Sequence, residues 1–231
     1  MRVIRRTRRG ARILGGGDVV SEILRQPGPT HTLFDVLAAC VAGLSPGPRI
    51  AVLGFGGGGI MAPLRAMGFA HPVQAVDVWK GGARLFRELS GEWAGEVRIA
   101  AVDAVRWIGG SRRLFDLVLE DLTVPVAGNE AKPAPSFEDL PRLIRGRLAP
   151  AGVFVLNALR PSGASWSGLR GAVTRVFRRV LELGFEDYHN RLWICGRRLP
   201  PAGAAPRAVR AARRPIGARP AVRVAGRPPT P

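Results

Sequence analysis

The stretch Val52–Ala66 (VLGFGGGGIMAPLRA) decides the fold of this chain. It starts inside a short β-branched run, Arg49–Gly54 (RIAVLG), and passes through a series of glycines. Apolar residues then recur at the spacing of a helix, at Ile60, Met61, Leu64 and Met67. A second apolar run follows at Val73–Val78 (VQAVDV). This order of strand, glycine turn, helix and strand predicts one βαβ unit.

The same alternation continues along the chain. We expect strands at 97–103, 115–122 and 152–159, helices at 83–89, 105–108, 139–148 and 166–180, and a closing hairpin at 181–196. Asp139 is the expected cap of the third of these helices. Near-continuously apolar strands that alternate with helices predict a Rossmann-like, mostly parallel sheet with helices on both faces. We assign this α/β domain to residues 45–196.

A smaller unit, residues 13–44, is expected in front of that domain. Ala11–Leu14 and Val19–Leu24 flank the glycine-rich turn 15–18, and this pattern predicts a β-hairpin. Residues 31–44 read as a helix that leads into the sheet.

The positive charge of the chain is concentrated at its two ends. The 231 residues carry a formal charge of +18, and residues 1–12 and 197–231 together hold fifteen arginines and no acid. Both segments have few large apolar residues to bury, so we expect them to be disordered. They are candidates for weak, nonspecific binding of a polyanion such as nucleic acid or anionic lipid, although compositional drift is the simpler explanation. Residues 13–196 are nearly charge-balanced, at +3.

Composition also narrows the compartment and the chemistry. The longest apolar stretch, Leu33–Leu44, is shorter than a membrane span and contains Asp35. Together with the missing apolar core of a secretory signal, this predicts a soluble cytoplasmic protein. Cys40 and Cys195 have no partner spacing and no nearby histidine cluster, so we predict buried, inert thiols and no metal site.

The glycine-rich loop is the first candidate binding element. Gly54, Gly56 and Gly59 satisfy the pattern G-x-G-x-x-G after a strand and before a helix. Glycine lets the backbone approach a nucleotide closely, and free amides at the helix start favour oxygen acceptors. Asp77, at the end of the second strand, is placed to accept both hydroxyls of a ribose. The alternative is a tight turn that binds no ligand.

Two further acids close the next strands. Asp103 and Asp121 should reach the same carboxyl edge of the sheet as Asp77, which is where open α/β folds bind ligands. Three acids at this edge suit a cationic sulfonium cofactor better than the pyrophosphate of a dinucleotide. Helix capping or a solvated strand end remains an equal alternative for Asp103 and Asp121 taken singly.

At this point the sequence resembles the spermidine synthase family, a branch of the class I S-adenosylmethionine-dependent methyltransferase fold. The resemblance spans roughly residues 11–196. Its motifs are Val52–Ala66, AVDV (75–78), AAVDAVRWI (100–108), FDLVLEDLTVP (115–125) and LAPAGVFVLNAL (148–159). The hairpin and the helix that contains His31 are more weakly similar.

The resemblance implies a cofactor, a set of site residues and a reaction. The cofactor would be S-adenosylmethionine or its decarboxylated form. Asp77 would bind its ribose, Asp103 and the backbone of Ala104 its adenine, and Asp121 would orient and deprotonate the attacking group. The loop residues Gly54, Gly56, Gly57 and Gly58 complete the predicted cofactor site. The family also implies homodimers or tetramers.

Three departures from the family concern the binding of a polyamine. The family's loop carries an aspartate where this chain has Gly57, its second catalytic-loop acid is replaced by Val124, and its tyrosine before the histidine is Thr30. A polycation needs paired carboxylates. Glu120 is a poor substitute, because successive strand residues point to opposite faces.

These observations leave several functions open. The favoured one is a transferase that moves a methyl or alkyl group from the sulfonium cofactor to a non-polyamine acceptor. The alternatives are a genuine polyamine aminopropyltransferase and a catalytically silent binding module with basic tails, with a nicotinamide-dependent reductase as a residual alternative.

Overall fold

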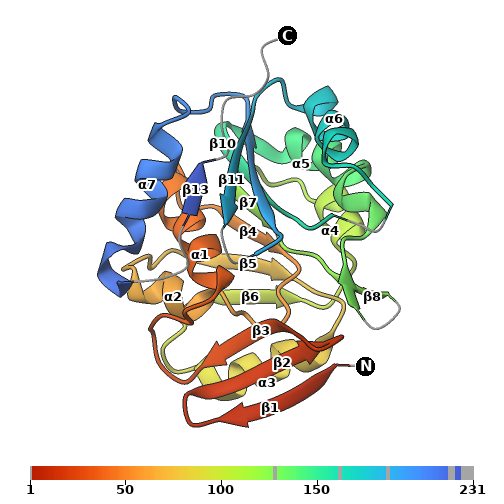
Figure 1. The fold of residues 1–231 in the computed structure, drawn as a ribbon. Helices are drawn as coiled ribbons and strands as arrows, with labels where there is room; N and C mark the ends of the chain where they lie inside the picture. The colour runs from red at the N-terminus through yellow and green to blue at the C-terminus, as the bar shows by residue number, and fades with distance from the viewer. Residues whose placement is uncertain (1, 127–128, 161–162, 186–187, 218–221, 225–231) are drawn as a thin grey trace.

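The predicted α/β domain is built on an eight-stranded sheet in the computed structural model (Figure 1). The structure describes residues 2–126, 129–160, 163–185, 188–217 and 222–224. The strand order is β13-β11-β12-β10-β7-β4-β5-β6. The five strands from β10 to β6 run parallel, whereas β12 and β13 are antiparallel to their neighbours. The bounds are β4 (Ile50–Leu53), β5 (Val73–Val76), β6 (Val97–Ala100), β7 (Phe115–Glu120), β10 (Leu148–Ala158), β11 (Val180–Phe185), β12 (Arg191–Gly196) and β13 (Val222–Val224).

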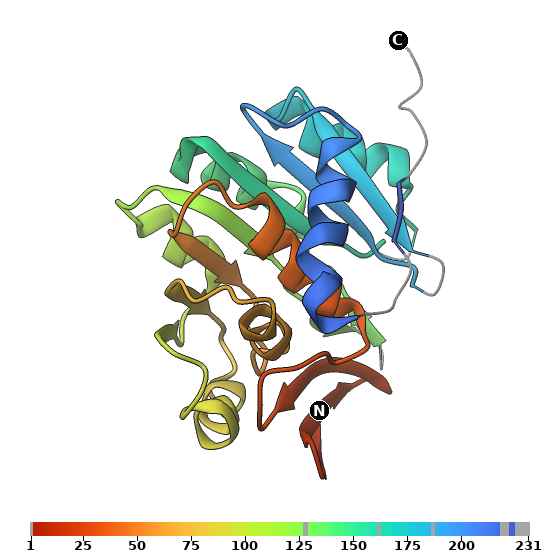
Figure 2. The same cartoon turned by 90° about the vertical axis from the view of Figure 1, so that its left-hand side faces the viewer.

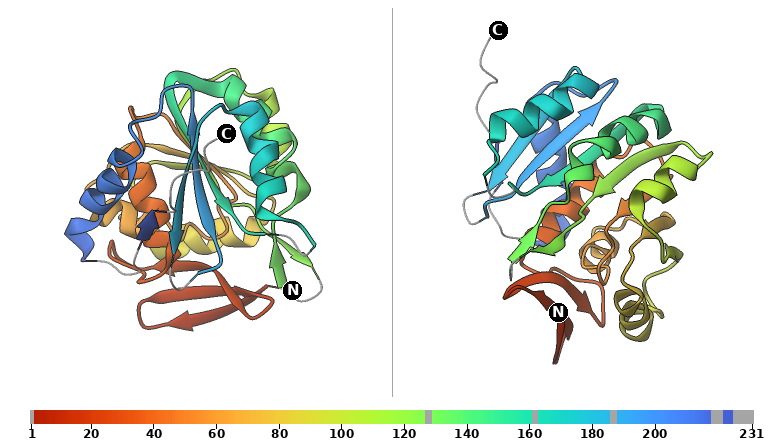
Figure 3. Two further views of the ribbon diagram at one scale, coloured as in Figure 1. Left: turned by 45° about the horizontal axis from the view of Figure 1, so that its top comes forward. Right: turned by 90° about the vertical axis from the view of Figure 1, so that its right-hand side faces the viewer.

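Helices cover both faces of the sheet, as predicted (Figure 3). One layer contains α1 (Leu33–Leu44), α2 (Met61–Ala66), α3 (Lys80–Ser90) and α7 (Ala204–Arg213), and the other contains α4 (Ala104–Gly110), α5 (Asp139–Arg147) and α6 (Trp166–Val176). The strand β4 is buried on both faces: Ile50 and Val52 pack in the first layer, and Ala51 and Leu53 in the second. The strands that follow β4 in the sequence are added on both sides of it, with β5 on one side and β7 on the other. This reversal in strand order opens a crevice at the carboxyl ends of these strands.

The helix starts explain part of this arrangement. Thr32 caps α1 and Asp103 caps α4, each by accepting a backbone N–H with its side chain. The expected cap Asp139 is instead the first residue of α5, after Glu138, and makes no capping hydrogen bond. A carboxylate in the first turn still interacts favourably with the helix dipole.

The N-terminal unit is a three-stranded antiparallel sheet, larger than the predicted hairpin (Figure 1). The hairpin strands are β2 (Gly10–Gly15) and β3 (Asp18–Leu24), and β1 (Val3–Thr7) pairs with β2. The prediction that residues 1–12 are disordered is therefore wrong for the strands in that segment. Every residue of β1 is exposed, so backbone pairing holds it in place, assisted by an Arg6–Glu88 ion pair of 2.8 Å to α3.

The predicted disordered segment 197–231 is also partly structured. The helix α7 lies beside α1 (Figure 2), and β13 adds to the sheet edge. A Cβ on Gly43 of α1 would lie 2.8 Å from the Ala208 carbonyl oxygen, so the two backbones touch closely. Composition missed this helix because alanines facing a glycine pack through proximity instead of bulk. Residues 218–221 and 225–231 lie outside the described residues. Polyanion binding by the two ends, and dimer formation, stay predictions.

The remaining elements are short. They are the hairpin β8 (Val124–Val126) and β9 (Asn129–Ala131), the 3₁₀ turn η1 (Ala134–Ser136), and a second 3₁₀ turn, η2 (Arg214–Ile216). Among the described residues, no helix is long and apolar enough to cross a membrane.

Candidate functional site

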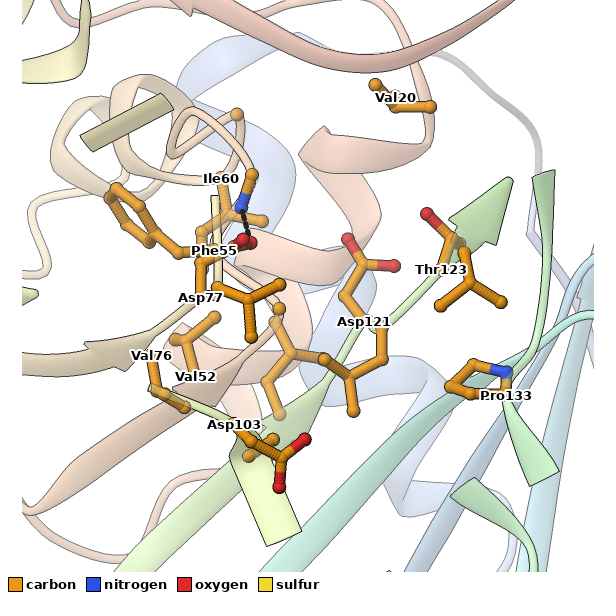
Figure 4. Close-up of a pocket in the computed structure, with 18 of the residues that line it drawn as sticks. Val20, Val52, Phe55, Ile60, Val76, Asp77, Asp103, Asp121, Thr123 and Pro133 are labelled. Atoms are coloured by element: carbon orange, nitrogen blue, oxygen red, sulfur yellow. Dashed lines mark hydrogen bonds between the residues drawn. The ribbon is translucent and has the colours of Figure 1, made fainter. Parts of the chain in front are cut away.

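A cavity of about 150 Å³, which we call the cleft, opens at the carboxyl ends of β4, β5 and β7 (Figure 4). Its walls bring together Asp77, Asp103 and Asp121, the three acids that the sequence placed at this edge. Gly54, Gly56, Gly59 and Ala104 also line it. These residues lie at one crevice, as predicted, because the strands that carry them are neighbours in the sheet.

The glycine loop packs closely against neighbouring segments of the chain. Gly54 has φ +86°, and a Cβ there would lie 2.6 Å from the carbonyl oxygen of Asp121, so only glycine fits. Gly57 and Gly58, by contrast, do not line the cleft. A Cβ on Gly57 would meet the Cδ1 atoms of Ile13 and Ile23, and one on Gly58 would meet the rings of Phe55 and Phe86.

The loop amides are also less available than the sequence suggested. The amides of Gly54 and Phe55 donate to the Val76 carbonyl oxygen. Ser21 Oγ, which reaches the loop from β3, accepts from the amides of Gly57 (3.2 Å) and Gly59 (3.1 Å). The expectation of free amides for a ligand is wrong at these positions, because β5 occupies the amides of Gly54 and Phe55 and the N-terminal sheet those of Gly57 and Gly59.

Asp77 is fixed by two backbone hydrogen bonds. Its Oδ2 accepts from the Gly56 amide at 2.6 Å, and its Oδ1 accepts from the Trp79 amide at 2.7 Å. Each carboxylate oxygen keeps further acceptor capacity, because two lone pairs are available and one is used. A pair of ligand hydroxyls can therefore still be accepted.

Asp103 has the capping role that was left open from the sequence. Its Oδ1 accepts from the Arg106 amide at 2.9 Å at the start of α4. The same side chain lines the cleft, next to the apolar side chains of Val78, Val102 and Val105. These apolar walls beside an acid suit the flat face and polar edge of a nucleobase.

Asp121 follows β7 and lies in a different electrostatic environment from Asp77. Burial raises the pKa of the Asp121 carboxyl above the ordinary aspartate value, and the charge of Asp77 acts in the same direction. Lys132 and a 2.6 Å hydrogen bond from Asn157 Nδ2 oppose the rise. Asn190 Nδ2 donates to Asn157 Oδ1 at 3.0 Å and so orients the amide. A carboxylate with a raised pKa and a fixed orientation is suited to accept a proton.

The adjacent acid, Glu120, is separate from the cleft, as predicted. Its buried carboxylate accepts from Lys132 Nζ at 3.0 Å and from Ser136 Oγ at 3.2 Å. Burial raises the pKa of Glu120 and the Lys132 charge counters it. This ion pair anchors the segment after β9 against the sheet.

A second cavity, of about 500 Å³, adjoins the cleft and shares Asp121 with it. We call it the adjoining cavity. The sequence did not indicate it, because β3, α1, β9 and the segment before β12 each contribute only one or a few side chains. Its polar wall residues include Asp18, Glu130, Asn157, His189 and Asn190. Val124 and Thr30, two of the three departures, are not among its lining residues.

Neither cysteine lines the cleft or the adjoining cavity. Cys40 and Cys195 are free and buried in the two helical layers, and burial raises both thiol pKa values, that of Cys40 to about 12. Among the described residues, no cluster of histidine, cysteine and acidic side chains could hold a metal ion.

Comparisons with known proteins bear on the fold. No protein-family model matches the sequence, and no curated protein matches it. Among solved structures, human methyltransferase-like protein 13 in complex with SAH superposes with a TM-score of 0.61 at 19% identity, over 82% of this chain and 92% of that one. Spermidine synthase from Thermotoga maritima gives 0.64 at 15% identity, over 87% and 74%. A spermidine synthase in complex with the transition-state analogue AdoDATO gives 0.66 at 14% identity, over 94% and 79%.

The chain therefore has the Rossmann-like fold that methyltransferases and spermidine synthases share. At these identities the likeness is one of fold. The function has to be argued from the cleft and the adjoining cavity.

Proposed function

We propose that this protein is a transferase that uses S-adenosylmethionine, or a closely related sulfonium nucleoside, to alkylate an acceptor held in the adjoining cavity. The sulfonium group supplies an activated carbon and a good leaving group. The protein then has to position the acceptor in line with that carbon and remove its proton.

Each part of the cleft has a place in this reaction. The free lone pairs of Asp77 suit the ribose hydroxyls, and the apolar walls around Asp103 and Ala104 suit the adenine. Negative charge at Asp77 and Asp121 favours a cationic sulfonium. The residues that line the cleft thus fit the cofactor, although Gly57 and Gly58 are not among them.

Asp121 would be the proton acceptor. The observation that carries the proposal is that this single carboxylate lines both cavities. It can therefore contact an acceptor in the adjoining cavity while it lies close to the cofactor in the cleft. Its raised pKa favours taking up a proton, and Asn157 holds it in orientation.

An Asp121→Asn variant tests this role. Cofactor affinity would be measured by calorimetry with S-adenosylmethionine, and turnover by transfer of labelled methyl to a panel of small amines, alcohols and thiols. We expect turnover to fall about 10²–10⁴-fold with little change in affinity. Asp139→Asn, the same change on the exposed surface of α5, is the matched control. Loss of affinity together with turnover would show that Asp121 is a binding or structural residue. Stabilisation by nicotinamide dinucleotides alone would refute the proposal as a whole.

One observation favours a second candidate, a polyamine aminopropyltransferase. Asp18 and Glu130 line the adjoining cavity, and they supply acids that the departure at Val124 removes. Paired carboxylates on this wall could offset the charge of a polycationic acceptor. Turnover of the decarboxylated cofactor with putrescine, at a higher rate than any methyl transfer, would establish this function in place of the first.

A further inference from the structure

Arg2 brings a positive charge to a cleft whose other charged walls are acids. It precedes β1, and its guanidinium lies over the Trp79 ring, with 5.1 Å between Cζ and the ring centroid. Trp79 is tied to the cleft because its amide donates to Asp77. Arg2 is the one basic side chain among the described residues that line the cleft. Sequence analysis did not indicate this role, because Arg2 lies in a segment expected to be disordered.

The guanidinium has donor capacity that the protein does not use. Arg2 Nη1 is buried and has no hydrogen-bond partner among the described residues. Each acid of the cleft accepts hydrogen bonds from groups other than Arg2: Asp77 and Asp103 from backbone amides, and Asp121 from Asn157. Within the described part of the chain, none of them forms an ion pair with Arg2. A buried, unsatisfied N–H of a charged group is costly, so it marks a place for an anionic acceptor.

The surroundings of the glycine loop indicate which anion is expected. The amides from Gly54 to Gly59 donate to acceptors of the protein, so they leave little for a negatively charged ligand group. Position 57 has neither the acid nor the space that would hold a ligand ammonium, because Ile13 and Ile23 fill it. The aspartate of the resembling family is missing at position 57, and this chain brings the guanidinium of Arg2 to the cleft.

We propose that Arg2 binds the α-carboxylate of the S-adenosyl amino acid and thereby makes the cleft selective for S-adenosylmethionine over its decarboxylated form. The inference rests on the proposed function and narrows it to transfer from the carboxylated cofactor. A guanidinium fits a carboxylate with two parallel N–H···O bonds, which is stronger and more specific than a single ammonium contact.

The test compares two ligands that differ only in the carboxylate. S-adenosylhomocysteine carries it, and S-adenosyl-3-thiopropylamine lacks it, while methylthioadenosine lacks the whole amino acid and reports on the nucleoside subsite. Calorimetry on the full chain would give Kd values for wild type, Arg2→Ala and Arg5→Ala. Arg5 is the matched control, because it is an exposed arginine of β1 that does not line the cleft.

We expect Arg2→Ala to raise the Kd of S-adenosylhomocysteine at least about tenfold and to leave the Kd values of the other two ligands within about twofold of wild type. Arg5→Ala should change none of the three. Retained binding of methylthioadenosine shows that the variant is folded. If Arg2→Ala weakened the binding of all three ligands equally, or left the Kd of S-adenosylhomocysteine unchanged, the role proposed for Arg2 would be overturned. The proposed function would still stand. If wild type bound none of the three, the proposed function would fail, and the role of Arg2 with it.

Discussion

Restoring an acid at position 57 probes why the glycine loop departs from the resembling family. A Cβ on Gly57 would lie 2.6 Å from Cδ1 of both Ile13 and Ile23, and 2.9 Å from Cγ1 of Ile23. Ordinary contacts of this kind are about 3.5–4.0 Å. Both isoleucines are fully buried, so neither can move into solvent. The N-terminal sheet therefore occupies the space that a side chain at position 57 needs.

The magnitudes follow from these contacts. Gly57→Ala adds only the methyl group and should cost about 2 kcal/mol of unfolding free energy, which is typical of overpacking a core. Gly57→Asp adds the burial of a polar group without a partner, worth a further ~1–3 kcal/mol. The aspartate variant should thus lose about 4 kcal/mol, a large fraction of the stability of an ordinary domain.

Urea denaturation followed by far-UV circular dichroism measures this loss as a lower midpoint at an unchanged m-value. Gly146→Ala is the control, because Gly146 is a helical residue in the last turn of α5 and a Cβ there meets nothing within 4 Å. That change should raise stability by about 0.5–1 kcal/mol, since alanine is the better helix former. Glycine flexibility is thereby separated from steric overlap.

A double-mutant cycle with Ile23→Ala isolates the contact itself. Ile23→Ala alone removes buried atoms and should cost about 2–5 kcal/mol. In that background, Gly57→Ala should cost clearly less than in wild type, because the added methyl group no longer meets Ile23 and overlaps only Cδ1 of Ile13. A coupling of at least ~1 kcal/mol is expected. If Gly57→Ala were harmless in wild type, or equally costly in both backgrounds, the steric reasoning would be refuted.

Three further predictions concern the site and its surroundings. Ser21→Ala should lower the unfolding free energy by about 2 kcal/mol, measured by urea denaturation, because it leaves two buried loop amides without an acceptor. Asn157→Ala should move the acid limb of the pH–activity profile to higher pH, since it removes a hydrogen bond that lowers the raised pKa of Asp121; an unmoved limb would contradict this. Cys40 should resist thiol reagents at pH 8 until the chain is unfolded, because burial raises its pKa to about 12; prompt labelling of the native protein would count against it.

How far the sequence reaches depends on the range of the interactions involved. The βαβ unit from Arg49 to Val78 was predictable because apolar periodicity and glycine punctuation are local signals. The meeting of Asp77, Asp103 and Asp121 was predictable as well, because parallel strands share a carboxyl edge. These inferences require only the order of elements along the chain.

The contacts that refine the site are long-range and leave no local pattern. Ser21 reaches the glycine loop from 36 and 38 residues away, and Asn157 reaches Asp121 across 36. The helix α7 was missed for a related reason. Its alanine-rich sequence has little bulk to bury, and only the glycine on the facing helix makes close packing favourable.

The N-terminal sheet shapes the surroundings of the glycine loop, where Gly57 departs from the resembling family. Ser21 occupies two amides of the glycine loop, those of Gly57 and Gly59, and Ile13 and Ile23 fill the space beside Gly57. Just before β1, Arg2 reaches the cleft itself. These contacts reinforce one another: with the amides and position 57 occupied, recognition of the ligand's far end depends on a side chain instead of the loop backbone. If Arg2 has the role proposed above, this small sheet would set which charge the cleft binds, so exchanging it for that of a polyamine enzyme should change cofactor preference before it changes the fold.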